Sequence, residues 1–289
     1  MVHDECYSTL LLKASAKLAK ILPEKLGNAI SFRWLSKVNA KGKVVTEIYP
    51  GIYMDLDLSD WLQKLYYLGF IERQRLDFVK SLIPRGGTFI DVGANVGLYS
   101  CVMANHVGFN GSVIAFEPMP ECLDQLHSNV KLNKLQNVTI HPVALSNQIG
   151  EIDLYVPPKH PGGPSGATQV WNPGDWKTAG SASSTKLDAV FHNDRLDFIK
   201  IDVQGHEIKV LEGAQKVIQQ FHPLVLCEVE KYNCVDILEF AENYEYSLFV
   251  ENDGYLKLLP ELKWSESEWI DLFLIPKKAN SALDTMIQK

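Results

Sequence analysis

The chain contains no stretch of about 18 consecutive apolar residues and no long run of lysine or arginine. The first absence argues against a transmembrane helix, and the non-basic start Met1-Val2-His3-Asp4-Glu5 argues against a signal peptide. With 28 basic against 35 acidic residues and a net charge of −7, nucleic acid or an anionic membrane is not expected as the main partner. These absences predict a soluble, cytoplasmic enzyme.

Cysteine is also scarce. The five cysteines are odd in number and form no C-x-x-C motif, and three of them fall in apolar patterns. They are therefore expected to be reduced and mostly buried thiols. With 289 residues, 46% of them hydrophobic, the chain can build one substantial α/β domain with an N-terminal appendage.

A glycine loop stands between two apolar segments. Asp91-Val92-Gly93-Ala94-Asn95-Val96-Gly97 follows the apolar residues 88–90 and precedes the helix-like segment 98–104. Gly93 and Gly97 allow a strand-to-helix turn that a ligand can approach closely. Asp91 at the mouth of this loop would repel a phosphate, so the loop is predicted to hold a cationic ligand.

A second acidic residue ends the next predicted strand. Glu117 lies 20 positions after Gly97, where it can accept hydrogen bonds from both hydroxyls of a ribose. Two cofactors are compatible with this arrangement. Nicotinamide cofactors usually require G-x-G-x-x-G, whereas the glycines here are spaced G-x-x-x-G. The sulfonium and ammonium charges of S-adenosylmethionine suit Asp91 better.

The remaining cofactor contacts are expected at neighbouring strand ends. Asn95 is expected around the methionine end, and Val143 and Ala144 beside the adenine. The cofactor-binding residues predicted from the loop and the strand ends are Asp91, Gly93, Ala94, Asn95, Gly97, Glu117, Val143, Ala144 and Asp202.

Strand and helix patterns alternate regularly from residue 88 onward, which requires a parallel sheet covered on both faces. The C-terminal segments have no helices long enough for parallel crossovers, so at least one terminal strand is predicted to be antiparallel. Strands are predicted at 88–93, 112–117, 138–145, 197–203, 223–229, 247–251, 255–259 and 269–276, and helices at 98–106, 120–132, 206–220 and 235–243.

Residues 1–65 are predicted to form an N-terminal helical and β-hairpin extension of a main domain at 66–280. The extension combines an amphipathic helix within 8–36 and a hairpin at 44–58 around Pro50-Gly51. Its helix is interpreted as a face packed on the main domain, with a homodimer contact or a membrane-surface element as the alternatives.

A long loop is predicted between Pro157 and Ser184. This segment is rich in proline and glycine and also contains Trp171 and Trp176. Long loops inside compact domains are often lids or binding loops, so we interpret residues 157–184 as a lid or substrate loop.

Several motifs together resemble the FkbM family of S-adenosylmethionine-dependent methyltransferases, over roughly residues 66–230. They are YLGFIE at 67–72, DVGANVG at 91–97, AFEP at 115–118, VALS at 143–146 followed by Gly150, TKLD at 185–188, IKIDVQGHE at 199–207, VL at 210–211 and GA at 213–214.

The resemblance implies a Rossmann-like α/β fold, whose seven-stranded sheet has helices on both faces and its last strand reversed. It also implies S-adenosylmethionine as the methyl donor, a hydroxyl oxygen as the usual acceptor, and a position for Glu72 on the cofactor side. The family usually has glutamate where this chain has Gln204, which weakens any role that needs a carboxylate there.

The catalytic candidates lie at the end of the fourth parallel strand, because the carboxyl ends of such strands face the ligand crevice. His206 is the predicted general base, since imidazole titrates near neutral pH. Asp202 could contact the methionine amine, orient His206, or hold Mg²⁺ with Glu228 or Glu230. Lys200 is predicted to neutralise Asp202, because an unperturbed lysine stays protonated at neutral pH.

Together these features predict an S-adenosylmethionine-dependent O-methyltransferase for a small hydroxyl compound, such as a sugar, a polyketide or another natural-product intermediate. Two alternatives stay open. A nicotinamide-dependent oxidoreductase is disfavoured by the missing G-x-G-x-x-G and by the absence of a Tyr-x-x-x-Lys pair after the fourth strand. A non-catalytic binding protein that retains the cofactor fold is indicated only by Gln204.

Overall fold

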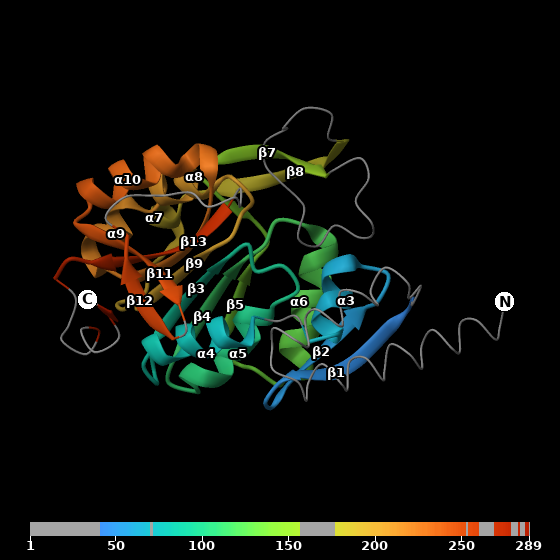
Figure 1. Cartoon of the computed structure of the whole chain (residues 1–289). Helices are drawn as coiled ribbons and strands as arrows, with labels where there is room; N and C mark the ends of the chain where they lie inside the picture. Colours follow the sequence, from blue (N-terminus) through green and yellow to red (C-terminus); the bar gives the residue numbers. More distant parts are fainter. Residues whose placement is uncertain are drawn as a thin grey trace.

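The computed structural model describes residues 41–69, 72–156, 177–252, 254–259, 269–278, 283 and 287–288. Within these ranges a nine-stranded sheet forms the centre of the molecule (Figure 1). No helix in these ranges is long and apolar enough to cross a membrane. The sheet comprises β3 (Thr88–Val92), β4 (Ser112–Phe116), β5 (Val138–His141), β9 (Phe198–Ile201), β10 (Leu224–Glu230), β11 (Tyr246–Asn252), β12 (Tyr255–Leu258), β13 (Trp269–Pro276) and β14 (Ile287–Gln288).

Seven of these strands follow the predicted architecture, in the order β5-β4-β3-β9-β10-β13-β11. β3 pairs in parallel with β4 and β9, and β9 with β10, whereas β13 is antiparallel to both β10 and β11. The predicted antiparallel terminal strand is therefore confirmed. β12 and β14 extend the sheet beyond β11, and the two residues of β14 are too few to carry a sequence pattern.

Helices cover both faces of the sheet, as the burial of β3 requires. All five residues of β3 are buried, and alternate side chains enter different cores. Phe89 packs in the core under α4 (Arg73–Leu82) and α5 (Leu98–Val107), whereas Ile90 and Val92 pack in the opposite core. That second core is covered by α7 (Leu187–Val190), α8 (Glu207–Glu212), α9 (Gln215–Phe221) and α10 (Cys234–Asn243), the last preceded by the 3-10 turn η1 (Lys231–Asn233).

Two predicted elements are each divided in the structure. The helix expected at 206–220 is wrong as a single element, because it consists of α8 and α9, which meet at Gly213-Ala214. A Cβ at Gly213 would lie 2.0 Å from the carbonyl oxygen of Ser146, so the chain passes this point in direct contact with another backbone segment. The strand expected at 138–145 is divided into β5 and β6 (Ala144–Leu145), and β6 joins a different sheet.

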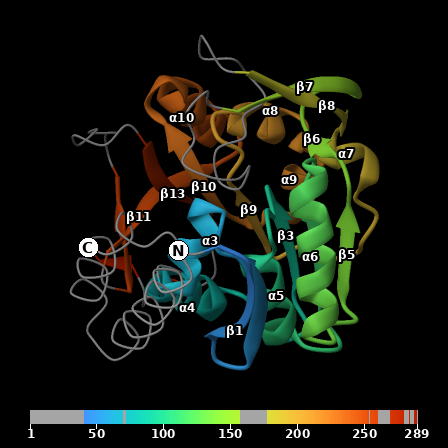
Figure 2. The ribbon, with the colours of Figure 1, turned by 90° about the vertical axis from the view of Figure 1, so that its right-hand side faces the viewer.

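The predicted hairpin is confirmed as β1 (Lys43–Tyr49) and β2 (Ile52–Asp57), which pair antiparallel. The segment after the hairpin forms α3 (Trp61–Tyr67) and α4. β2 contacts α6 (Pro120–Leu132), and Figure 2 shows the hairpin and α3 beside that helix. Side chains of the hairpin share one core with α4 and α5, so the described part of the extension packs as a layer of the main domain. The helix predicted within 8–36 lies outside the described residues.

A second sheet has the strand order β6-β8-β7. In this sheet, β7 (Gly150–Val156) and β8 (Lys177–Thr185) pair antiparallel. The predicted loop at 157–184 is therefore too long, since residues 177–184 belong to β8. β8 is built of small polar residues that lie mostly at the surface, so it lacks the alternation that marks a half-buried strand. Residues 157–176 lie outside the described part of the chain.

Candidate functional site

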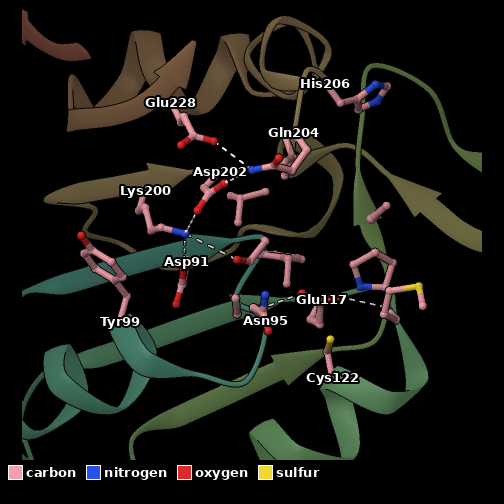
Figure 3. Close-up of a pocket in the computed structure, with 18 of the residues that line it drawn as sticks. Asp91, Asn95, Tyr99, Glu117, Cys122, Lys200, Asp202, Gln204, His206 and Glu228 are labelled. Atoms are coloured by element: carbon pink, nitrogen blue, oxygen red, sulfur yellow. Dashed lines mark hydrogen bonds and ion pairs between the residues drawn. The ribbon is translucent and has the colours of Figure 1, made fainter. Parts of the chain in front are cut away.

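A cavity of about 630 Å³ opens at the carboxyl ends of β3, β4, β9 and β10 (Figure 3). Parallel strands end at the same edge of a sheet, so the predicted strand-end residues from Asp91 to Glu230 meet there although up to 139 positions separate them along the chain. Gly97 is the predicted site residue that does not line the cavity. The sequence-predicted residues that do are Glu72, Asp91, Gly93, Ala94, Asn95, Glu117, Val143, Ala144, Lys200, Asp202, His206, Glu228 and Glu230.

The two glycines of the loop have different tasks. Gly93 has a φ of 75°, and a Cβ there would lie 2.0 Å from the carbonyl oxygen of Asp202, so it allows β3 and β9 to approach each other beside the cavity. Gly97 has a φ of 91°, and its Cβ would lie 2.4 Å from a methyl carbon of Leu126 on α6. Gly97 thus serves the packing of α6, and its predicted contact with the cofactor stays a prediction.

Asp91 presents a buried carboxylate oxygen that accepts no hydrogen bond from the described residues. Its side chain is fully buried, and Oδ2 accepts a hydrogen bond from the Ser100 hydroxyl at 2.6 Å. Oδ1 accepts no hydrogen bond from any described residue, and its nearest cation is Lys200 Nζ at 3.6 Å. A buried acceptor without a partner is costly, and a cationic ligand group would relieve that cost.

Glu117 is held by the backbone on both of its oxygens. Oε2 accepts a hydrogen bond from the Asn95 amide at 2.7 Å, and Oε1 accepts one from the Met119 amide at 2.9 Å. Burial raises the pKa of Glu117 to about 7, against the opposing effect of these two amides. Each oxygen keeps a second lone pair, so the carboxylate can also accept two hydroxyl hydrogen bonds from a ligand.

Lys200 links the two halves of the site. Its ammonium lies 3.2 Å from Asp202 Oδ2, 3.6 Å from Asp91 Oδ1 and 5.2 Å from the centre of the Tyr99 ring. Burial lowers the pKa of Lys200, but Asp202 and Asp91 outweigh it and raise the pKa above its ordinary value. Lys200 therefore stays protonated, in the neutralising role predicted for it.

Gln204 joins Asp202 to the neighbouring strand. Its amide nitrogen donates to Asp202 Oδ1 at 3.1 Å and to Glu228 Oε2 at 2.9 Å (Figure 3). Burial raises the pKa of Asp202, but Lys200 and the hydrogen bonds outweigh it and lower the pKa. Burial and the Asp202 charge raise the pKa of Glu228 to about 9. Asp202 is thus ionised at neutral pH, and Glu228 holds a proton.

His206 lies at the edge of this group. Its Nε2 is 3.0 Å from the Ser146 hydroxyl, and Figure 3 shows its ring directed away from Lys200 and Asp91. Burial, assisted by the Lys209 charge, lowers the pKa of His206 to about 4, so the imidazole is neutral at physiological pH. Asp202 accepts a hydrogen bond from Gln204 and forms an ion pair with Lys200. Neither contact involves His206, which Asp202 was predicted to orient.

The predicted metal ligands Asp202, Glu228 and Glu230 all line the cavity. Within the described ranges, no group of three His, Cys, Asp or Glu side chains is arranged to hold a metal ion. Glu72, predicted from the family pattern, lies at the rim with a φ of 48° and an ion pair to Arg75 at 2.8 Å.

Four aromatic residues of the cavity wall were not selected as site residues from the sequence: Tyr66, Tyr99, Phe116 and Trp269. Tyr99 could have been found, because it stands in the first turn of a helix whose N-terminus faces the cavity. Trp269 begins β13 and pairs with Glu230 across the sheet, a register that the sequence does not show.

Comparisons with known proteins find methyltransferases among the relatives of this chain. Residues 91–248 match the family model described as the methyltransferase FkbM domain. The chain is 26% identical over 163 residues to the methyltransferase sdnD of Sordaria araneosa, covering 46% of this chain and 62% of that protein. It is 28% identical over 138 residues to the hexuronic acid methyltransferase AglP of Haloferax volcanii, covering 47% of this chain and 53% of that protein.

The chain thus spans little more than half the length of these two curated relatives. Among solved structures, the methyltransferase FkbM from Methylobacillus flagellatus KT is similar with a TM-score of 0.43 and 15% identity. This match covers 73% of this chain and 54% of that one.

Proposed function

The chain belongs to the FkbM methyltransferase family, and from this premise we propose that it transfers a methyl group from S-adenosylmethionine to a hydroxyl oxygen of a small molecule such as a sugar or another natural-product intermediate. The observation that carries the proposal is the pair of buried carboxylates on the two sides of the glycine loop. Asp91 offers the methionine ammonium a buried oxygen that accepts no hydrogen bond from the described residues, and Glu117 offers two lone pairs for the ribose hydroxyls.

Calorimetric titration with S-adenosylmethionine, S-adenosylhomocysteine and NAD⁺ tests the donor directly. We expect micromolar binding of the first two and no binding of NAD⁺, because a dinucleotide pyrophosphate would meet the Asp91 carboxylate at the mouth of the loop. Binding of NAD⁺ alone would overturn the proposal and indicate an oxidoreductase.

The chemistry is an in-line displacement at the sulfonium methyl, and most of the rate is expected from holding the reacting atoms collinear. The acceptor hydroxyl also loses a proton, and a positioned base typically contributes about 10²- to 10⁴-fold. We propose Asp202 for this task. Its carboxylate is ionised and lies beside Lys200 in the cavity, whereas the sequence-predicted base His206 points toward Ser146.

Asp202→Asn should therefore lower turnover at saturating S-adenosylmethionine by about 10²- to 10⁴-fold, and His206→Ala by less than about tenfold. Both variants are measured with a hydroxyl acceptor found in a panel of methyl glycosides, and kcat is separated from the KM for the donor. A larger loss of turnover in His206→Ala than in Asp202→Asn would contradict this assignment and identify the His206 imidazole as the base.

The charge of the cavity wall leads to a prediction about the acceptor. Among the described residues that line the cavity, Lys200 is already paired with two carboxylates and His206 is neutral at physiological pH. In the described part of the wall, the charged cation is therefore already paired, and a carboxylate on the acceptor would find no free partner. Bringing like charges together costs several kcal/mol.

We therefore expect kcat/KM for a neutral methyl glycoside to exceed that for the matching uronate by at least about tenfold. The pair of acceptors should be compared at several salt concentrations, because an electrostatic preference weakens as salt rises. Preference for the uronate would contradict this expectation and would make the acceptor similar to that named for AglP.

A further inference from the structure

Both oxygens of the Asp202 carboxylate face nitrogen donors from its own strand and loop. Lys200 Nζ lies 3.2 Å from Oδ2, and Gln204 Nε2 lies 3.1 Å from Oδ1. The same Gln204 nitrogen lies 2.9 Å from Glu228 Oε2 on β10. An amide nitrogen therefore lies between the carboxyl groups of Asp202 and Glu228, which come from adjacent strands, as Figure 3 shows.

The loop that presents Gln204 is fixed by buried polar contacts. Gln204 has a φ of 52°, in the left-handed region that only a few non-glycine residues adopt. The next amide, of Gly205, donates to Glu207 Oε1 at 2.8 Å, and Asn233 Nδ2 donates to the Gly205 carbonyl at 3.1 Å. Glu207 and Asn233 are both buried. The position of the amide is therefore determined by the fold.

These residues do not fit a divalent metal ion. Mg²⁺ requires near-octahedral oxygen ligands at about 2.0–2.1 Å. An ion bridging Asp202 and Glu228 would occupy the place of the Gln204 nitrogen, a donor that cannot ligate it. The Lys200 ammonium, 3.2 Å from Asp202, would repel a second cation at the same carboxylate.

We propose that Lys200 and Gln204 take the place of a divalent cation, so that the methyl transfer runs without a metal ion. The inference rests on the proposed function. Lys200 supplies the positive charge that keeps Asp202 ionised, and Gln204 is a positioning residue that holds Asp202 against Glu228.

Every atom of the step is accounted for by donor, acceptor and Asp202. A lone pair of the acceptor oxygen forms the new C–O bond, and the C–S bond breaks with its electron pair going to sulfur, which leaves a neutral thioether. The hydroxyl proton passes to the Asp202 carboxylate while its bonding pair stays on oxygen. The proton becomes strongly acidic as positive charge develops on that oxygen, so a carboxylate is a sufficient base.

Manganese binding tests the inference before any acceptor is known. The full-length protein, its Gln204→Glu variant and the matched variant Gln219→Glu, an exposed glutamine on α9, are titrated with Mn²⁺ and followed by electron paramagnetic resonance. Gln204→Glu removes the bridging donor and adds a third carboxylate, so we expect it to bind Mn²⁺ at least roughly tenfold more tightly than the other two.

Mn²⁺ binding by the unchanged protein that disappears in Asp202→Asn would overturn the inference. Equal weak binding by all three proteins would also overturn it, because Gln204 would then not be what excludes the ion. Calorimetry with S-adenosylmethionine on the same samples separates this inference from the proposed function. If the unchanged protein did not bind S-adenosylmethionine, the proposed function alone would be contradicted.

Turnover of a methyl glycoside provides the second readout. The unchanged protein and Gln219→Glu should retain their turnover in EDTA, whereas Gln204→Glu should lose about 10²-fold in kcat with its KM for S-adenosylmethionine little changed. Loss of turnover on chelation in the unchanged protein, restored by Mg²⁺, would show that the reaction needs the metal.

Discussion

Glu117→Ala is expected to weaken the binding of S-adenosylmethionine by about 10²- to 10⁴-fold. Two ribose hydroxyls donating to an ionised, buried carboxylate contribute roughly 1.5–3 kcal/mol each. The backbone donors Asn95 and Met119, at 2.7 and 2.9 Å, fix the carboxylate before the ligand arrives, so little ordering remains to be done on binding. Calorimetric titration gives the change in Kd.

Two further variants make this result specific. Glu121→Ala removes an exposed glutamate in the first turn of α6 and should bind the donor as the unchanged protein does. Glu117→Gln keeps the shape of the side chain, but its amide group must face one of the two backbone donors, so it should also lose most of the affinity. If both Glu117 variants bound the donor with an affinity within about threefold of that of the unchanged protein, Glu117 would not be the residue that binds the ribose.

The pKa of Glu117 adds a pH dependence whose direction can be derived. Burial raises this pKa to about 7 in the ligand-free protein, so acidification below that value protonates the carboxyl. The ribose hydroxyls bind the ionised form best, so donor affinity should be constant above about pH 7 and fall by up to about tenfold per pH unit below it. Glu117→Gln should show no such dependence from this position.

The sequence predicted for a physical reason that two carboxylates line one cavity. Asp91 and Glu117 each end a strand of a parallel sheet, and all such ends meet at one edge, so a position in the sequence pattern is also a position in space. The antiparallel direction of β13 was predictable for a different reason: the segments before it are too short for a parallel crossover.

Other features depend on contacts between distant segments. The bridge from Gln204 to Glu228 requires the register of β9 against β10, and Gln204 was noted only as a departure from the family pattern. The direction of His206 depends on Ser146, 60 positions earlier in the chain. A residue type suited to catalysis does not reveal which neighbour its side chain meets.

Glycine positions show the same limit. Gly93 and Gly97 are equivalent in the sequence pattern, and both have positive φ values in the structure. One allows two strands to approach at the cavity and the other accommodates Leu126 of α6. A pattern predicts that glycine is needed, whereas only the packed structure shows whether a ligand, a helix or a neighbouring strand takes the space.

Gly93→Ala is accordingly expected to be the most damaging small substitution at the site. Its Cβ would lie 2.0 Å from the Asp202 carbonyl oxygen, so β3 and β9 must separate where they position Asp91 and Asp202. The positive φ costs about 1 kcal/mol and the overpacking about 1–3 kcal/mol, so we expect the free energy of unfolding to fall by about 2–4 kcal/mol. Denaturant titration measures this change.

Gly51→Ala is the matched control, because Gly51 has a φ of 76° against 75° for Gly93, but no atom lies within 4 Å of its added Cβ. It should lose only the backbone cost of about 1 kcal/mol and keep its affinity for S-adenosylmethionine. Gly93→Ala should lose at least about tenfold in that affinity, since each carboxylate acts through its distance from the ligand. Equal destabilisation in the two variants would mean that the strands separate without cost, and the close approach at Gly93 would then not be what holds the site together.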